Sequence, residues 1–399
     1  MAKDINPPRG MRDFLPAEKA KREGVLGLIR GVFSSFGFQE VESPALENLD
    51  RLTSGQGGDN EKLAYRVMKR GAELESALES KGESDSLADL GLRFDLTVPL
   101  TRFYATNRAS LPTVFKAIQM GPVWRAERPQ KGRYRQFVQC DIDIIGDDSV
   151  VAEVELITAT LATLKALGLG NSVIRVNHRT LLTSLIGGFG VSAEGLGKAM
   201  IIIDKLDKIA ADGVVTELRE QFGDAVADKA AAWLASVDTS VIPAELTSLF
   251  DAVEKGKLRF DPTLVRGMGY YTGAIFEIEH PGSGLAIGGG GRYDGMVGRW
   301  LGTDVPAVGI SLGFDRVVEL FEEPAKSSGV VLVLEDGSVA VLTKALAFQK
   351  ALIAKGMQVR LEVRPKRLNL LLDSMAANGF SQFALVDSTT TALDLKPIA

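Results

Sequence analysis

The sequence predicts an α+β protein: an antiparallel sheet flanked by helices, with a largely helical insertion and a small terminal α/β domain built on a parallel sheet. Three observations support this fold class. Residues 123–146 place strand-like ends around a basic loop, which predicts two antiparallel strands. Residues 171–260 are rich in Ala and Leu at helical spacing. Residues 329–399 alternate strand-like and helix-like segments, the order that builds a parallel sheet with right-handed crossovers.

The composition is that of a soluble globular protein of two or three domains, with 399 residues, 45% hydrophobic and 24% charged. The net charge of -5 argues against a general nucleic-acid coat protein, because phosphate binding needs a basic field. It permits a selective RNA enzyme, since basic residues cluster at 125–135 and 360–367. We therefore expect a locally basic groove on a mildly acidic protein.

Cysteine and histidine are scarce. Cys140 stands alone, which excludes an intramolecular disulfide framework and fits a reducing compartment. With only His178 and His280 besides, a metal site built from protein His or Cys is not expected. The start MAKDINPPRG lacks the features of a signal peptide, and no apolar run approaches membrane-spanning length. We expect a cytoplasmic protein with no membrane partner.

The chain opens with an extended, Pro-containing lead-in and then a helix. Residues 17–36 repeat apolar side chains at helical spacing, and Gly37 is the expected cap. The following segment predicts a helix-to-strand transition with Pro44 in the strand. Residues 72–90 are polar and rich in small side chains, which predicts a loop or insertion.

The stretch LRFDLTVPL, residues 92–100, alternates apolar and polar side chains. It predicts a strand that ends at Pro99, before a helix. Asp95 and Thr97 would share one face of this strand, where both can point at a bound ammonium group. The alternative, a solvent-facing polar stripe on an edge strand, remains open from this stretch alone.

The second strand of the basic hairpin also alternates in character. Phe137, Gln139, Asp141 and Asp143 fall on one face, opposite Val138, Cys140, Ile142 and Ile144. The loop before it carries Arg125, Arg128, Lys131, Arg133 and Arg135. These charges repel one another unless an anion lies among them, and guanidinium groups suit phosphate oxygens. A solvated surface loop is the competing interpretation.

Residues 148–168 predict a helix, and 171–260 predict a strand followed by several helices. His178 falls at a helix start, where a cap or surface role is more common than catalysis. In LVRGMGYYTGAIFEIEH, 264–280, an Arg and paired tyrosines occupy a Gly-punctuated turn before a buried-type strand. Guanidinium, phenols and backbone can therefore approach a ligand closely.

Four successive glycines in GLAIGGGGRYDGMVG, 284–298, indicate a chain that passes flush against a ligand. A disordered linker is disfavoured because apolar residues flank the run, and the spacing is not that of a dinucleotide-binding fold. Residues 307–321 predict a strand entering a helix, with Arg316 near a helix N-terminus that can bind an anion. Residues 324–328 form a short hinge before the terminal strands and helices.

Taken together, these stretches resemble the histidyl-tRNA synthetases, a family of class II aminoacyl-tRNA synthetases. Arg-x-Glu with a basic loop, followed by GRYRQF and QCDIDIIG, is similar to motif 2. LRFDLTVP, RGMGYYTG and the glycine-rich stretch are similar to the histidine signatures, with Gly269 where most members carry an acid. The helix-to-strand transition and residues 307–321 resemble motifs 1 and 3 more weakly.

The resemblance implies a class II fold, with a catalytic core at 1–170 and 261–324, an insertion at 171–260 and a shortened anticodon-binding-like domain at 329–399. It implies histidine-tRNA ligase activity, in which ATP and Mg²⁺ activate L-histidine and tRNA(His) receives it. It also implies a homodimer.

The roles that the resemblance assigns are as follows. Catalysis would involve Arg266 and Arg125; ATP would contact Arg125, Glu127 and Arg316; histidine would contact Asp95, Thr97, Gln139, Asp143, Arg266, Tyr270 and Tyr271; and the tRNA acceptor end would contact Arg128, Lys131 and Arg133.

A binding protein is the alternative: a paralogue of this family serves as the histidine-sensing regulatory subunit of ATP phosphoribosyltransferase. Such paralogues usually lose catalytic arginines or the terminal domain. Arg125, Arg266, Arg316 and a terminal α/β domain are all present, which favours the ligase. The short tail and Gly269 count slightly the other way.

Overall fold

The computed structural model describes residues 5–53, 62–80, 84–130, 132–267, 269–322 and 329–398. The chain forms two compact units. The first combines the residues up to Arg12 with Val25–Phe321, and the second combines Asp13–Gly24 with the chain from Glu322 onward. In the described residues, no helix is both long and apolar enough to span a membrane.

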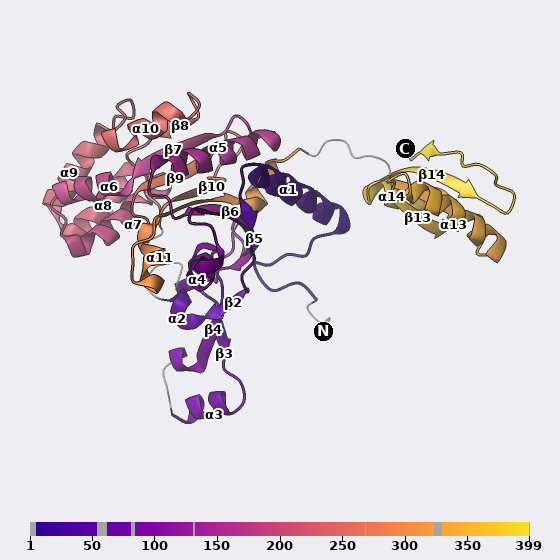
Figure 1. Cartoon of the computed structure of the whole chain (residues 1–399), viewed down its shortest axis with the longest axis horizontal. Coiled ribbons are helices and arrows are strands. Elements are labelled where there is room, and N and C mark those ends of the chain that lie inside the picture. Colours follow the sequence, from indigo (N-terminus) through magenta and orange to yellow (C-terminus); the bar gives the residue numbers. More distant parts are fainter. Residues whose placement is uncertain are drawn as a thin grey trace. The chain divides into compact units, whose positions relative to one another are not determined.

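The first unit is built on an eight-stranded sheet of order β1-β5-β6-β11-β10-β9-β7-β8 (Figure 1). Its strands are β1 (Gln39–Glu40), β5 (Phe115–Trp124), β6 (Gln136–Ile145), β7 (Val173–His178), β8 (Leu258–Phe260), β9 (Ala274–Glu279), β10 (Gly288–Arg292) and β11 (Ala307–Gly313). The strands from β5 to β7 in this order pair antiparallel, while β1 and β8 join the edges in parallel. The antiparallel pair predicted around the basic loop is confirmed as β5 and β6.

One face of the sheet packs against helices α1 (Pro16–Ser35), α5 (Val150–Ala166), α10 (Ala244–Ala252) and α12 (Phe314–Leu320). Cys140, Ile142 and Ile144 of β6 are buried in this layer, as the alternation predicted. Burial of a large aliphatic side chain contributes about 1.5–3 kcal/mol, so this layer stabilises the first unit. The opposite face carries α4 (Thr97–Asn107) and α11 (Asp294–Leu301) and leaves the polar side of β6 for the site.

The predicted insertion is a strand followed by several helices, as the sequence predicts. Helices α6 (Arg179–Gly188), α7 (Leu196–Ile203), α8 (Leu206–Phe222) and α9 (Asp224–Ala235) precede α10 in it. The range 171–260 also contains β7 and β8, which belong to the main sheet. His178 caps α6 by accepting a hydrogen bond from the Thr180 N–H at 3.3 Å, which confirms the structural role predicted for it.

Three local predictions are wrong. Residues 72–90 are not one loop, because they contain helix α3 (Ala72–Glu79) and the start of β4 (Ala88–Leu92), which pairs with β2 (Leu46–Asn48) and β3 (Arg66–Met68). The strand predicted to run to Pro99 ends at Leu92 instead. Asp95 accepts a hydrogen bond from the Val98 N–H at 3.1 Å, which stabilises the first turn of α4 and makes Thr97 helical. Pro44 lies between β1 and β2 rather than in a strand.

The second unit contains the parallel sheet that the sequence predicted. Strands β12 (Gly329–Leu334), β13 (Val359–Val363) and β14 (Phe380–Val386) pair in parallel, and β15 (Lys396–Pro397) joins β14 antiparallel. Helices α13 (Val339–Ile353) and α14 (Leu368–Ala377) make the crossovers. The strands and helices of this unit bury their own apolar clusters. The predicted hinge at 324–328 falls outside the described residues.

Candidate active site

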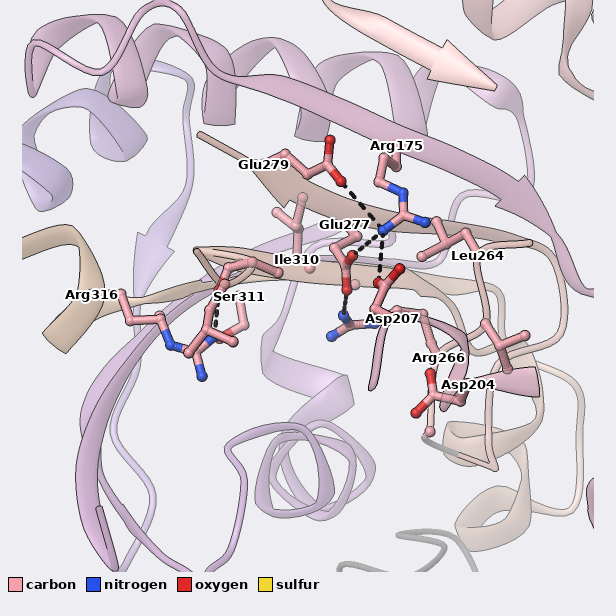
Figure 2. Close-up of a pocket in the computed structure, with 18 of the residues that line it drawn as sticks. Arg175, Asp204, Asp207, Leu264, Arg266, Glu277, Glu279, Ile310, Ser311 and Arg316 are labelled. Carbon is pink, nitrogen blue, oxygen red and sulfur yellow. Dashed lines mark hydrogen bonds and ion pairs between the residues drawn. The ribbon is translucent and has the colours of Figure 1, made fainter. Parts of the chain in front are cut away.

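A cavity of about 1170 Å³ opens over the polar face of the main sheet (Figure 2). It brings together most of the predicted site residues: Asp95, Thr97, Arg125, Glu127, Arg133, Gln139, Asp143, Arg266, Tyr270, Tyr271 and Arg316. Arg128 is exposed and is not among the residues that line it. Lys131 lies outside the described residues. Segments far apart in the chain therefore converge on one polar space.

The floor of the cavity is the polar face of β6. Gln139 donates from its amide nitrogen to the Ser311 hydroxyl on β11 at 2.9 Å, and Ser311 also hydrogen-bonds Asp141. Among the described residues, Gln139 Oε1, Asp141 Oδ1 and Asp143 Oδ2 are buried without a hydrogen-bond partner. Buried acceptors of this kind are costly unless a ligand or water satisfies them. The floor is therefore suited to a ligand with several N–H donors.

Gly309 leaves space for the Asp143 carboxylate in this floor. A Cβ atom at Gly309 would lie 1.9 Å from Asp143 Oδ1, so a side chain there would displace the carboxylate. The same oxygen accepts a hydrogen bond from the Tyr293 hydroxyl at 2.6 Å. Burial raises the pKa of Asp143 to about 7, although the Tyr293 hydrogen bond opposes the rise and the charge of Asp95 adds to it.

Asp141 lies beside Asp143 and is almost fully buried. Burial raises the pKa of Asp141 well above its usual range, and the nearby charge of Asp143 raises it further. Like charges this close cannot both ionise freely in a low-dielectric site. A cation bound against this floor would favour the ionised carboxylates.

Two tyrosines and the segment before α4 form a side wall. The rings of Tyr270 and Tyr271 meet edge to face with centroids 4.9 Å apart, and Tyr270 also packs edge-on against Tyr293 at 6.0 Å. The Tyr270 hydroxyl hydrogen-bonds Thr97, and Tyr271 hydrogen-bonds Tyr270. Asp95 is buried and also lines the cavity. Aromatic faces beside hydroxyl and carboxyl groups suit a flat, polar ring.

Arg125 occupies the cavity at the end of the β5–β6 hairpin. Its Nε donates to the Phe94 carbonyl at 3.0 Å, and its guanidinium lies over the Phe137 ring, 5.0 Å from the centroid. Burial lowers the pKa of Arg125, opposed by the charges of Asp95 and Glu127, and an arginine remains protonated at neutral pH. These contacts fix the side chain in position.

Arg316 holds the opposite rim together. It donates to the Ala286 carbonyl and, at 3.5 Å, to the Gly132 carbonyl in the basic loop. Burial lowers the pKa of Arg316, and the positive charge of Arg133 adds to the effect. Arg133 in turn lies 3.6 Å from the Glu127 carboxylate. A pair of like-charged guanidinium groups at this rim favours an anion between them.

Arg266 extends from the segment between β8 and β9 into the same cavity. Its Nη1 donates to Glu277 Oε2 at 2.8 Å, and its Nε is buried without a partner among the described residues. A Cβ atom at Gly289 would lie 2.8 Å from the Arg266 guanidinium, so the glycine strand leaves room for that group. Burial acts to lower the pKa of Arg266, but Tyr271, Glu277 and Asp204 raise it overall.

Sequence reasoning missed several residues of the cavity. Asp141 lies between Gln139 and Asp143 on the polar face of β6, a position that the alternation predicts without indicating a role. Glu277 interrupts the buried run of β9, and a charged residue between Phe276 and Ile278 is the available signal. Ser311 carried no signal of its own, because its role depends on the pairing of β11 with β6.

Comparison with known proteins places this arrangement in a class and then in a family. A solved structure of histidyl-tRNA synthetase from Nostoc sp. PCC 7120 matches 99% of this chain and 95% of its own, with a TM-score of 0.76 and 25% identity. The large sheet with its flanking helices is that of the class II aminoacyl-tRNA synthetase fold. The histidyl-tRNA synthetase family model matches residues 10–317. The chain belongs to the histidyl-tRNA synthetase family.

Relatives of similar length support this assignment. A histidine-tRNA ligase from Leifsonia xyli is 54% identical over all of this chain and 99% of its own. A probable histidine-tRNA ligase from Tropheryma whipplei is 39% identical over 96% of each chain. A Bacillus halodurans structure described as an ATP phosphoribosyltransferase regulatory subunit/histidyl-tRNA synthetase is 18% identical with a TM-score of 0.74, and shows the fold alone.

Proposed function

We propose that this chain is a histidine-tRNA ligase, which activates L-histidine with ATP and transfers the histidyl group to tRNA(His). The observation that carries the proposal is the convergence of Arg125, Arg266 and Arg316 on one cavity, beside a floor of buried carboxylates. Cationic groups and carboxylates side by side are what the joining of ATP to an amino acid requires. Full-length relatives named histidine-tRNA ligase support the same reaction.

The arginines carry the nucleotide chemistry in this proposal. Activation is an in-line attack of the histidine carboxylate on the α-phosphate of ATP, so negative charge develops between two anions. Arg125 binds the α-phosphate, and Arg266 stabilises the charge that develops as pyrophosphate leaves. Arg316 lies against the nucleotide on the other side, and Glu127 binds its adenine end. Fixed guanidinium groups need little reorganisation during the reaction, which is the source of their effect.

The carboxylates and tyrosines bind histidine. Asp95 and Asp143 attract its ammonium group, while Gln139 and Thr97 provide oriented polar groups. Tyr270 and Tyr271 close against the imidazole ring, and Arg266 also contacts the histidine carboxylate. A neutral imidazole has one donor and one acceptor nitrogen, so a site built to pair both rejects amino acids that lack them.

Other components of the proposal rest on the family. Mg²⁺ would be held by the ATP phosphates and would supply charge neutralisation there. The arginines that line the cavity can bind the other phosphate oxygens. Arg128, Lys131 and Arg133 contact the acceptor end of tRNA. The enzyme acts in the cytoplasm as a homodimer, with residues 329–399 as the tRNA-reading domain.

Beyond the short tail and Gly269, no feature of the described residues favours the regulatory-subunit alternative. Arg125, Arg266 and Arg316 are all retained in the cavity, where a protein that only senses histidine has no use for them. The terminal α/β unit is also present.

Pyrophosphate exchange tests the proposal. Exchange of labelled pyrophosphate into ATP should require both L-histidine and Mg²⁺, because only histidyl-adenylate formation links them. Labelled histidine should then become acid-precipitable with tRNA, which separates a ligase from a histidine sensor. Exchange supported by a different amino acid and not by histidine would refute the assignment.

A further inference from the structure

A row of polar positions crosses the main sheet beneath Arg266. In the strand register, Asp141 of β6 pairs with Ser311 of β11, and Ser311 pairs with Gly289 of β10. Gly289 pairs with Glu277 of β9, and Glu277 pairs with Arg175 of β7. Paired residues project to the same face of a sheet, so these side chains form one line. Gly289 is the gap in that line.

The Arg266 guanidinium fills this gap from above. A Cβ atom at Gly289 would lie 2.8 Å from both Cζ and Nη2 of Arg266, which places the group directly over the glycine backbone. Figure 2 shows Arg266 reaching Glu277, and the bond from its Nη1 to Glu277 Oε2 is 2.8 Å long. The position of Arg266 thus depends on Gly289, which leaves space for the guanidinium, and on Glu277, which forms an ion pair with it.

Glu277 is itself held by a second arginine. Its other oxygen, Oε1, accepts a hydrogen bond from Arg175 Nη1 at 2.9 Å (Figure 2). One carboxylate therefore joins two guanidinium groups, one to each oxygen. Each of these charge-assisted bonds limits the rotation of the Glu277 side chain.

Arg175 is in turn fixed by other parts of the fold. It is buried, and it ion-pairs with Asp261 at 2.6 Å, near the start of the segment that carries Arg266. It also lies 3.5 Å from Asp207 in the first turn of α8. Burial acts to lower the pKa of Arg175, but Asp261 and the other carboxylates raise it overall, so it stays charged. The helical part of the unit therefore contacts the same network as the sheet.

We infer that Glu277 and Arg175 are positioning residues for Arg266: they hold its guanidinium over Gly289, oriented toward the reacting phosphate. The inference rests on the role proposed for Arg266 above. Neither residue needs to touch a substrate to act in this way. An arginine displaced by an ångström loses much of its stabilisation of the transition state, while substrate contacts elsewhere in the cavity remain.

Glu277→Gln is the variant that tests this inference, because the amide keeps the size of the side chain but not its charge. We expect the rate constant of histidyl-adenylate formation to fall about tenfold or more, with the KM values for histidine and ATP changed less than about threefold. Arg175→Lys keeps a charge but lacks the planar fork, so it should lower the rate constant by a smaller factor. Single-turnover quench-flow measurements give these rate constants.

A double-mutant cycle distinguishes positioning from a general structural role. If Glu277 acts through Arg266, then Glu277→Gln should have no further effect on the rate constant in an Arg266→Ala background. Arg175→Lys should likewise have no further effect there. Glu155→Gln is the matched control, since it removes the charge of another part-buried ion pair, with Lys116, away from the cavity. It should leave the rate constant within about twofold of the wild type.

The outcomes separate this inference from the proposed function. A Glu277→Gln protein that reacts at the wild-type rate would overturn the inference while leaving the ligase assignment intact. An equal rate loss from Glu277→Gln with and without Arg266 would also overturn it, because Glu277 would then act by itself. If the wild-type protein showed no histidine-dependent exchange, the proposed function would fail and the inference with it. Melting temperatures of all variants check that each is folded.

Discussion

At the scale of single residues, Asp143 is the group whose ionisation the fold controls most clearly. It is buried on the cavity floor, hydrogen-bonded to Tyr293, and its pKa is raised to about 7. An unfolded chain ionises aspartate near its ordinary value of 3.8, so between these two pH values the folded chain retains a proton that the unfolded chain has released. The stability contributed by Asp143 is therefore present at acid pH and is lost as pH rises through about 7.

Asp143→Asn should remove this pH dependence. We expect the free energy of unfolding of the wild type, relative to the variant, to decline by about 4 kcal/mol between pH 4 and pH 7 and then to level off. Urea unfolding of both proteins across this range measures the difference. A constant difference at all pH values would show that Asp143 is already ionised in the folded chain.

The sequence could predict some site residues for a physical reason. The alternation of β6 separates Gln139 and Asp143 from buried aliphatic residues. The two-residue period of a strand is therefore enough to predict that they share one face. Arg266 and Tyr271 could be placed near a ligand because the turn around them is rich in glycine. Glu277 could not be assigned, because its role depends on cross-strand register, which is set by tertiary packing.

At the scale of elements, a buried ion pair joins strand β10 to helix α5. Arg292 donates from Nε and Nη2 to the two oxygens of Glu153, each at 2.6 Å, and both residues are buried. Arg292 Nη1 also donates to the Asp147 carbonyl at 3.1 Å, before the helix begins. This fork holds α5 against the end of the glycine strand.

Glu153→Ala should therefore destabilise the protein by about 3–5 kcal/mol, because it removes both short bonds to the buried Arg292 and leaves Asp294, at 3.3 Å and more exposed, as its counter-charge. Glu155→Ala, two residues along the same helix, removes a less buried pair with Lys116 and should cost about 1 kcal/mol or less. Chemical denaturation of both variants measures the two losses. Equal losses would mean that the Arg292 charge is satisfied by other groups.

Elements with strong periodicity were predicted well, and short ones were not. The β5–β6 hairpin and the long helices carry their pattern over many residues, so local sequence is enough to specify them. The prediction of a strand through residues 92–99 is wrong. The apolar residues Phe94 and Leu96 are buried there, but the chain between them bends and does not continue as a strand. The Asp95 side chain stabilises the start of a helix at that point, and this local bond overrides the alternating pattern.

At the scale of the whole molecule, the second unit has its own hydrophobic clusters, and none of its described residues lines the cavity. Removal of residues 329–399 should leave the pyrophosphate exchange rate within about twofold, since the cavity is complete without them. It should weaken tRNA charging, measured as a higher KM for tRNA. Unchanged charging would show that the terminal domain does not read tRNA.

The arrangement of units and strands was only partly accessible from sequence. Strand-helix alternation was enough for the parallel sheet of the second unit. The order of the main sheet was not accessible, because β6 lies beside β11, which is more than 150 residues away in the chain. Likewise, β7 and β8 join that sheet from within the predicted insertion. Such long-range pairings are decided by the packing of the complete core.

The close approaches at Gly289 and Gly309 have a consequence for changing the amino acid that the protein accepts. Both strands present bare main chain to the cavity, and any larger residue would collide with Arg266 or Asp143. Substitutions at Gly289 and Gly309 are therefore poor choices in a library that aims to make the cavity accept a different amino acid. Useful diversity has to come from the side chains of β6 and the tyrosine wall, where one group can replace another without moving the backbone.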